Sequence, residues 1–274
     1  MTTSTNDRNT VGKGSYAEVN GLKMYYEIYG MGKPLVLLHG GLMTIGKMGQ
    51  ILPSLAKTRQ VIAVELQAHG HTADIDRALT YEQMADDTAA LIKHLGLERA
   101  DVFGFSVGGG VALQTAIRHP EVVRKLVVVS ASYNSDGEYP EIRALEESFQ
   151  AESSILSPMR EAYISIAPKP QDWPRLVDKM RSLLAEDYDW AQDVAAIQAP
   201  TLIVVGDADT VRPAHAVELF GLLGGGKAAS AMGNLSNAQL AVLPGTTEFS
   251  MLARIDLLLA IITPFLDAPM PIAT

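Results

Sequence analysis

The stretch that decides the fold is Asp101-Val102-Phe103-Gly104-Phe105-Ser106-Val107-Gly108-Gly109-Gly110. An apolar run typical of a short buried strand ends at Ser106, and a helical pattern over residues 111–119 follows at once. Gly104 and Gly108 flank the serine two residues away on each side. A strand that turns into a helix so abruptly strains the corner residue, and its neighbours must lack side chains for the helix to pack closely.

This spacing predicts that the hydroxyl of Ser106 stands above the edge of the sheet. The first turn of the following helix would offer free N–H groups and a positive dipole end beneath it. The alternative interpretation is a glycine-rich turn without chemistry. The strand before the serine and the helix after it favour the sharp corner.

Three further stretches extend the pattern along the chain. They are Leu35-Val36-Leu37-Leu38-His39-Gly40-Gly41, Pro200-Thr201-Leu202-Ile203-Val204-Val205-Gly206-Asp207-Ala208-Asp209 and Leu243-Pro244-Gly245-Thr246-Thr247-Glu248-Phe249. With the serine corner, and in this order, they resemble the α/β-hydrolase family of the serine esterase or lactonase type, over residues 16–269. The resemblance implies an α/β fold with a mostly parallel central sheet, helices on both faces and a small helical cap.

The resemblance also implies a role for particular residues. Ser106 would be the nucleophile, and the backbone N–H groups of Gly41 and Val107 would bind the oxyanion. Asp209 would be the carboxylate of a catalytic triad, with Asp207 as the second choice. No cofactor is implied.

Position 248 departs from the family, because the resemblance calls for histidine where this chain has Glu248. Imidazole suits the task, since its pKa lies near neutrality and its two nitrogens face the serine and the acid together. Glutamate has a reference pKa of about 4.3 and would also face Asp209, so one of the two carboxyls should hold a proton. We therefore expect a hydrolase impaired by replacement of its base, either by engineering or by natural drift.

The six histidines offer no evident replacement for the missing base. By resemblance, His39 is a structural histidine beneath the loop that follows its strand. His69 and His71 alternate with small residues, and neither has a second histidine at helical metal-ligand spacing, so no metal site is expected. His215 is close in sequence to the acid, but its helix should point it elsewhere.

Composition sets the domain organisation. With 274 residues and 47% hydrophobic residues, the chain fits one α/β core with a small insertion. The polar residues 1–15 predict a disordered N-terminal tail. Residues 16–131 and 193–274 would form the core, and residues 132–192, where prolines recur and strand patterns vanish, would form a helical cap inserted in it.

Five large residues of this segment could line an acyl pocket: Phe149, Met159, Tyr163, Trp173 and Trp190. The alternative for each is that it only packs the cap against the core.

Local signals mark several element ends. Asn20-Gly21 predicts a tight turn in an N-terminal hairpin. Thr80, with Gln83 three residues later, predicts a capping box at the start of a helix that Gly96 stops. The final helix is expected from Ser250, kinked or ended near Pro264.

Charge and composition restrict the partners. The net charge of −9 comes without any cluster of Lys and Arg, so nucleic acid is not expected. Without cysteine there is no disulfide or thiolate metal site. No signal peptide or membrane-spanning stretch is evident, which predicts a cytoplasmic protein that does not bind membranes. A homodimer is left open.

Two classes of function follow from these observations. The first is a serine hydrolase that cleaves a small-molecule carboxylic ester or lactone, and cofactor-free perhydrolase or haloperoxidase chemistry uses the same triad. The second is a non-catalytic protein that binds a small molecule in the same pocket. The intact serine corner favours the first, because a receptor has less use for a strained serine.

Overall fold

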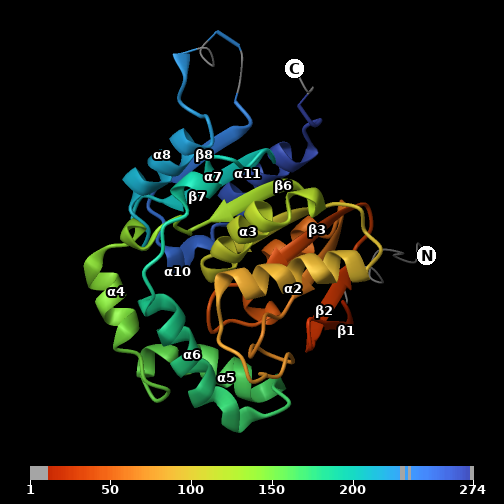
Figure 1. Cartoon of the computed structure of the whole chain (residues 1–274), viewed down its shortest axis with the longest axis vertical. Helices are drawn as coiled ribbons and strands as arrows, with labels where there is room; N and C mark the ends of the chain where they lie inside the picture. Colours follow the sequence, from red (N-terminus) through yellow and green to blue (C-terminus); the bar gives the residue numbers. More distant parts are fainter. Residues whose placement is uncertain (1–11, 229–231, 234–235, 272–274) are drawn as a thin grey trace, which may run out of the picture.

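The computed structural model describes residues 12–228, 232–233 and 236–271. Within them, eight strands form one sheet in the order β1-β2-β4-β3-β5-β6-β7-β8 (Figure 1). The strands are β1 (Lys13–Val19), β2 (Leu22–Tyr29), β3 (Lys33–Leu38), β4 (Arg59–Val64), β5 (Ala100–Phe105), β6 (Val123–Val129), β7 (Thr201–Gly206) and β8 (Ala238–Leu243). The pairs from β4 through β8 are parallel, and only β1 and β2 run antiparallel to their neighbours.

The N-terminal hairpin turns at Asn20-Gly21, where both residues have positive φ, 48° and 79°. Its first strand begins at Lys13 rather than at residue 16. The predicted tail is therefore three residues too long, because the backbone of residues 13–15 pairs with β2. The rest of that prediction, residues 1–11, lies outside the described residues.

Helices cover both faces of the sheet, which has a separate apolar cluster on each side. Because side chains alternate along a strand, Leu35 and Leu37 of β3 join one cluster, while Val36 and Leu38 join the other. The Val36 side is covered by α2 (Tyr81–His94), α3 (Val107–Arg118) and α8 (Pro213–Leu222), and the Leu35 side by α1 (Ile51–Leu55) and α11 (Ile255–Asp267).

Four helices lie between β6 and β7 in the sequence, within the segment of residues 132–192 and just beyond it. They are α4 (Pro140–Glu147), α5 (Ser157–Ile166), α6 (Trp173–Ala185) and α7 (Ala191–Val194). In Figure 1, α4, α5 and α6 extend away from the sheet, below the α10 helix (Glu248–Met251). We call residues 132–192 the inserted segment.

The two helix-end signals have different outcomes. Thr80 accepts a hydrogen bond from the Gln83 N–H at 3.1 Å at the start of α2, and Gly96 follows its end with φ +68°. The final helix instead begins at Ile255, because a separate short helix, α10, starts at Glu248. It continues past Pro264 to Asp267, so the proline lies in its last turn.

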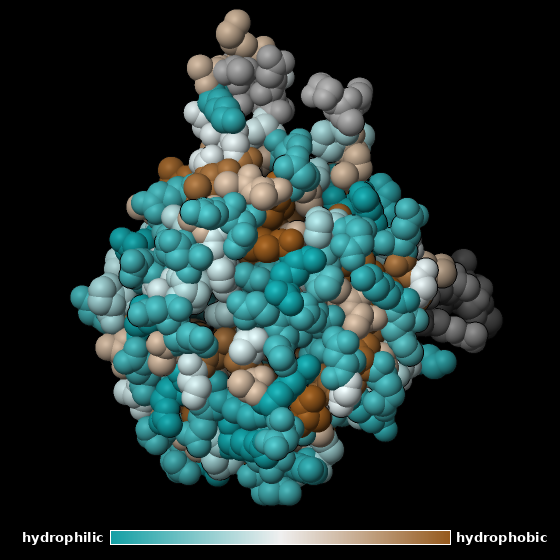
Figure 2. Space-filling model, viewed as in Figure 1, coloured by the Kyte–Doolittle hydropathy of each residue, from teal (hydrophilic) through white to brown (hydrophobic). Residues whose placement is uncertain are grey.

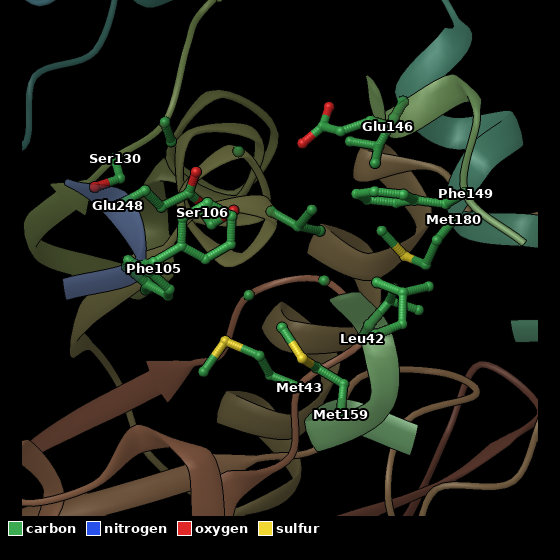
Figure 3. A pocket seen from close by; sticks show the side chains of 18 of the residues that line it. Leu42, Met43, Phe105, Ser106, Ser130, Glu146, Phe149, Met159, Met180 and Glu248 are labelled. Atoms are coloured by element: carbon green, nitrogen blue, oxygen red, sulfur yellow. The ribbon is translucent and has the colours of Figure 1, made fainter. Parts of the chain in front are cut away.

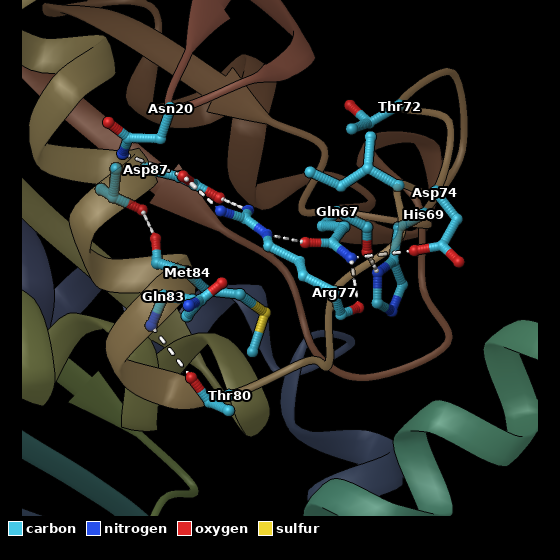
Figure 4. A network of polar contacts seen from close by, with 12 residues as sticks. Asn20, Gln67, His69, Thr72, Asp74, Arg77, Thr80, Gln83, Met84 and Asp87 are labelled. Atoms are coloured by element: carbon cyan, nitrogen blue, oxygen red, sulfur yellow. Dashed lines mark hydrogen bonds and ion pairs between the residues drawn. The ribbon is translucent and has the colours of Figure 1, made fainter.

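A polar network fixes the long connection between β4 and α2 (Figure 4). Arg77 pairs with the buried Asp87 of α2, and its Nε donates to Gln67 Oε1 at 2.5 Å. Asn20 donates to the same aspartate at 3.0 Å, which joins this network to the hairpin turn. Lys179 of α6 donates to Asp74 at 2.7 Å, so the network also anchors the inserted segment.

The surface in Figure 2 is mostly hydrophilic, with apolar side chains in separate small groups. Among the described residues, no helix combines the length and apolarity needed to span a bilayer.

The two glycines beside Ser106 hold α3 against the sheet. A Cβ on Gly104 would lie 2.1 Å from the carbonyl oxygen of Gly108, and a Cβ on Gly108 would lie 2.5 Å from the carbonyl oxygens of Leu38 and His39. These are backbone atoms and cannot swing aside. Both glycines are therefore required by the close approach of helix and strands.

We predict that Gly108→Ala destabilises the fold by about 3 kcal/mol or more, because overpacking against backbone forces α3 away from β3. Gly221→Ala is the matched control. A Cβ added to Gly221, which lies in α8, would meet no described atom within 4 Å beyond its chain neighbours and its own helix backbone, so alanine there should stabilise by about 0.5–1 kcal/mol through helix propensity. Urea unfolding measures both variants, and equal stability of the two would contradict the packing argument.

Candidate active site

Ser106 occupies the corner between β5 and α3, with φ 53° and ψ −124°. Within residues 101–110 it is the one residue that is not buried. Its N–H donates to the Val129 carbonyl at 2.9 Å, and its own carbonyl accepts from Gly109 at 2.7 Å. The strained backbone is thus held from both sides, and the side chain faces a cavity of about 550 Å³.

Gly41 and Val107 line the same cavity beside the serine. A Cβ on Gly41 would approach the Val107 Cγ2 atom to 3.1 Å, so the Val107 side chain packs directly against Gly41. The next residue, Leu42, has φ 59°, and its N–H donates to His69 Nε2 at 3.0 Å. This bond fixes the loop after β3 in a conformation that few non-glycine residues adopt.

Two buried histidines, His39 and His69, hold that loop in place through hydrogen bonds to backbone groups. The Nδ1 of His39 pairs with the Gly40 carbonyl at 2.8 Å, and its Nε2 accepts from the Leu66 N–H at 3.3 Å. His69 has the same arrangement, with Nδ1 on the Gln67 carbonyl at 2.8 Å. Burial lowers the pKa of His39 to about 3 and that of His69 to about 4, so both are neutral and structural.

The two candidate acids after β7 point in different directions. Asp209 is buried and accepts hydrogen bonds from the Gly206 N–H and the Ser130 hydroxyl, both at 2.8 Å. Burial raises its pKa. Asp207 is exposed and accepts a hydrogen bond from the Thr246 N–H at 3.1 Å. This bond connects the loop after β7 to the loop after β8.

Glu248 is the first residue of α10, and its carboxyl group points toward Ser106 (Figure 3). Asp209, the acid expected to face position 248, lies near Glu248 and is connected to it through Thr210. The Thr210 hydroxyl contacts Glu248 Oε2 and lies 3.4 Å from Asp209 Oδ1. Sequence reasoning missed Thr210, whose one signal is that it immediately follows the acid.

The environment of Glu248 makes its carboxyl group far more basic than a free glutamate. Burial raises its pKa from 4.5 to about 7. Hydrogen bonding from the hydroxyls of Ser106 and Thr210 opposes this rise, and the charges of Asp209 and Glu138 add to it.

A second carboxyl pair lines the cavity, contributed by the inserted segment. Glu146 of α4 hydrogen-bonds to Glu138, and burial with the adjacent Glu138 charge raises the pKa of Glu146 to about 9. Since the pKa values of both carboxyl groups are raised, the pair shares a proton, with the Arg143 charge nearby. Neither acid carries a motif in the sequence, so sequence reasoning did not find them.

The rest of the cavity is largely apolar. Phe149 and Met159 line it as predicted for them, together with Met43, Phe105 and Met180.

Tyr163, Trp173 and Trp190 do not line the cavity, contrary to the prediction from sequence. Trp173 is buried, donates to the Ala151 carbonyl at 2.9 Å and packs on Tyr163 with ring centroids 5.5 Å apart. Trp190 stacks on Tyr188 at 4.3 Å. These rings hold the inserted segment together and attach it to the core.

None of the six histidines lines the cavity. His215 is buried, stacks on Tyr133 at 4.1 Å and accepts its N–H at 3.1 Å, and burial lowers its pKa to about 4. Among the described residues, no group of three or more His, Asp or Glu side chains could hold a metal ion.

Comparison with known proteins agrees with this geometry. Residues 33–153 match the alpha/beta hydrolase fold family. The chain is 30% identical over 216 residues to 2-hydroxy-6-oxo-2,4-heptadienoate hydrolase of Pseudomonas putida, covering 67% of this chain and 75% of that protein. The chain therefore belongs to the α/β-hydrolase fold family.

Solved structures give the same result for the fold. The enol-lactonase from Burkholderia xenovorans superposes with a TM-score of 0.74 at 19% identity, covering 93% of this chain and 100% of that one. An N-acyl homoserine lactone degrading enzyme superposes with a TM-score of 0.70 at 26% identity, covering 92% and 100%.

We predict that Glu248→Gln gains stability over the parent chain as pH rises. In the folded state Glu248 holds its proton up to about pH 7, whereas in the unfolded chain it ionises near pH 4.3. Its ionisation therefore costs the parent stability progressively across this window, and the full cost is present above pH 7. Between pH 4 and 8 the variant should gain about 3 kcal/mol relative to the parent in urea unfolding.

The exposed carboxyl of Asp207 provides the control for this experiment. Hydrogen bonds from the N–H groups of Gly245 and Thr246 lower its pKa. Asp207→Asn should therefore show no such gain with rising pH, and a gain equal to that of Glu248→Gln would rule out the buried-carboxyl explanation.

Proposed function

We propose that the protein hydrolyses carboxylic esters or lactones through an acyl-enzyme on Ser106. The observation that carries this proposal is the strained Ser106 corner, which faces a cavity beside Gly41 and Val107. Attack by a serine hydroxyl on an acyl carbonyl needs an exposed nucleophile and N–H donors for the oxyanion, and the first turn of α3 supplies such donors. The lactone-cleaving enzymes of the same fold support this class of substrate.

The cavity favours a substrate with a medium-sized apolar acyl group. Its volume of about 550 Å³ is in the range of small-molecule sites, and methionine and aromatic side chains dominate the wall opposite Glu248. The inserted segment acts as a cap in this proposal. It contributes Phe149, Met159 and Met180 to the lining.

Glu248 makes the proposed reaction slower than it would be with histidine. An imidazole donates one N–H to the acid while its other nitrogen accepts the serine proton. An ionised carboxylate only accepts hydrogen bonds and here has a second carboxylate, Asp209, close by. We therefore propose an enzyme that retains its nucleophile and has an impaired base.

The competing function is non-catalytic binding of a small molecule in the same cavity. A panel of p-nitrophenyl esters of increasing acyl length and of simple lactones separates the two. We expect turnover that falls to background in Ser106→Ala, because the hydroxyl is the only nucleophile proposed. Binding of the ester without Ser106-dependent turnover in any member of the panel would favour the binding protein.

A second prediction concerns Glu248→His. Imidazole at this position would face Ser106 and Asp209 together, and general base catalysis contributes about 10²–10⁴-fold. We expect kcat/KM on the best ester to rise at least about 100-fold at pH 7.5. The double variant with Ser106→Ala should lose the whole gain, and a gain that survives this change would contradict the proposed nucleophile.

A further inference from the structure

The side chain of Glu248 is held in one position by contacts on both sides. A residue without a function at this position would not need such contacts. One face of its carboxyl group meets Ser106, and its Oε2 contacts the Thr210 hydroxyl. The residue is also the first of α10, whose N-terminal Thr247 forms a complete capping box with Ser250 at 3.2 Å and 3.0 Å. The backbone that carries Glu248 is therefore fixed.

Thr210 is fixed just as firmly, from the opposite side. The Glu138 backbone forms a β-bridge with Val211, and Arg212 N–H donates to the Gly137 carbonyl at 2.9 Å. These bonds clamp residues 210–212 against the start of the inserted segment. The Thr210 hydroxyl is thereby held between two carboxyl groups, those of Asp209 and Glu248.

We infer that Glu248 is the general base for Ser106 and that Thr210 is the residue that positions it. This inference rests on the ester or lactone hydrolysis proposed above. In this scheme Glu248 carries out, less efficiently, the proton transfer that histidine carries out in the family.

The chemistry of the step balances without any further component. The Ser106 proton passes to a Glu248 oxygen while the serine Oγ bonds to the substrate carbonyl carbon, whose oxygen becomes an oxyanion. When the tetrahedral species collapses, the ester C–O bond breaks and the leaving alkoxide takes the proton from Glu248. Water then attacks the acyl carbon and gives a proton to Glu248. When this second tetrahedral species collapses, the bond between the acyl carbon and Ser106 Oγ breaks, Glu248 returns the proton to Oγ, and the carboxylic acid leaves.

The surroundings make this carboxylate suitable as a base at neutral pH. A free glutamate would be a poor acceptor, but the pKa of Glu248 is raised to about 7, in the range of imidazole. Transfer of a proton to Glu248 also removes its repulsion with Asp209.

Other charged groups line the cavity that Glu248 faces. Glu138 and Glu146 face the cavity from the inserted segment, and the Glu248 charge in turn raises the pKa of Glu146. The basic side chains on the cavity wall are Lys47 and Arg181. We therefore expect one ascending limb in the pH–rate profile between pH 5 and 8.

The decisive experiment measures Ser106-dependent kcat/KM on one p-nitrophenyl ester from pH 5 to 9.5. For the parent chain we expect the rate to rise with pH and level off above a midpoint near 7. Glu248→Gln keeps the size of the side chain and loses the basic oxygen, so it should lower the plateau about 100-fold. Asp207→Asn is the matched control and should leave the profile unchanged.

Thr210 is tested by a shift in the profile rather than by loss of rate alone. Its hydroxyl stabilises the Glu248 carboxylate, so Thr210→Val should move the midpoint toward alkaline pH by about one unit. Thr210→Ser should restore it. A purely structural role would lower the rate equally at every pH and leave the midpoint in place.

The outcomes separate this inference from the proposed function. If Ser106→Ala abolishes turnover but Glu248→Gln does not lower it, the inference is wrong and the hydrolase remains. If Ser106→Ala leaves turnover unchanged, the proposed function itself is wrong. Glu248→Gln is expected to be at least as stable as the parent near pH 7, so urea unfolding of the same variant separates loss of the base from misfolding.

Discussion

The close approach of α3 to the sheet is the constraint on which the rest of the structure depends. Gly108 lies against the carbonyl oxygens of Leu38 and His39, and Gly104 against that of Gly108. This contact forces Ser106 into a positive φ and raises its hydroxyl into the cavity. It also brings the loop after β3 to the first turn of α3, so the nucleophile and its candidate oxyanion donors arise from a single packing requirement.

The second organising feature is the crowding of carboxyl groups around that cavity. Asp209, Glu248, Glu138 and Glu146 come from the ends of β7 and β8 and from the inserted segment, and burial raises the pKa of each. Groups so placed cannot all ionise, and protons must be shared among them. In the family pattern an imidazole would donate an N–H to Asp209. In this chain a hydroxyl, Thr210, separates Asp209 from the carboxyl group at position 248.

Three buried histidines have structural roles in this protein. His39 and His69 use both ring nitrogens to hold backbone groups beneath the loop after β3, and His215 fixes the start of the inserted segment. Each is buried and kept neutral, so none is free for proton transfer. None of the six histidines lines the cavity, which is why the proposed base is the carboxyl group at position 248.

The sequence by itself determined the buried strands and the serine corner, because these follow from local rules of apolar runs, glycine spacing and turn residues. The mostly parallel sheet and the difference at Glu248 followed from the resemblance to the α/β-hydrolase family. Only the tertiary structure decided that Thr210 bridges the carboxyls, that Glu146 joins them and that Trp173 and Trp190 pack away from the cavity. The carboxyl groups concerned are distant in sequence, since Glu248 lies 38 residues after Thr210 and more than 100 after Glu146. The basicity of Glu248 has the same origin, since burial among distant chain segments sets a pKa that residue type alone cannot give.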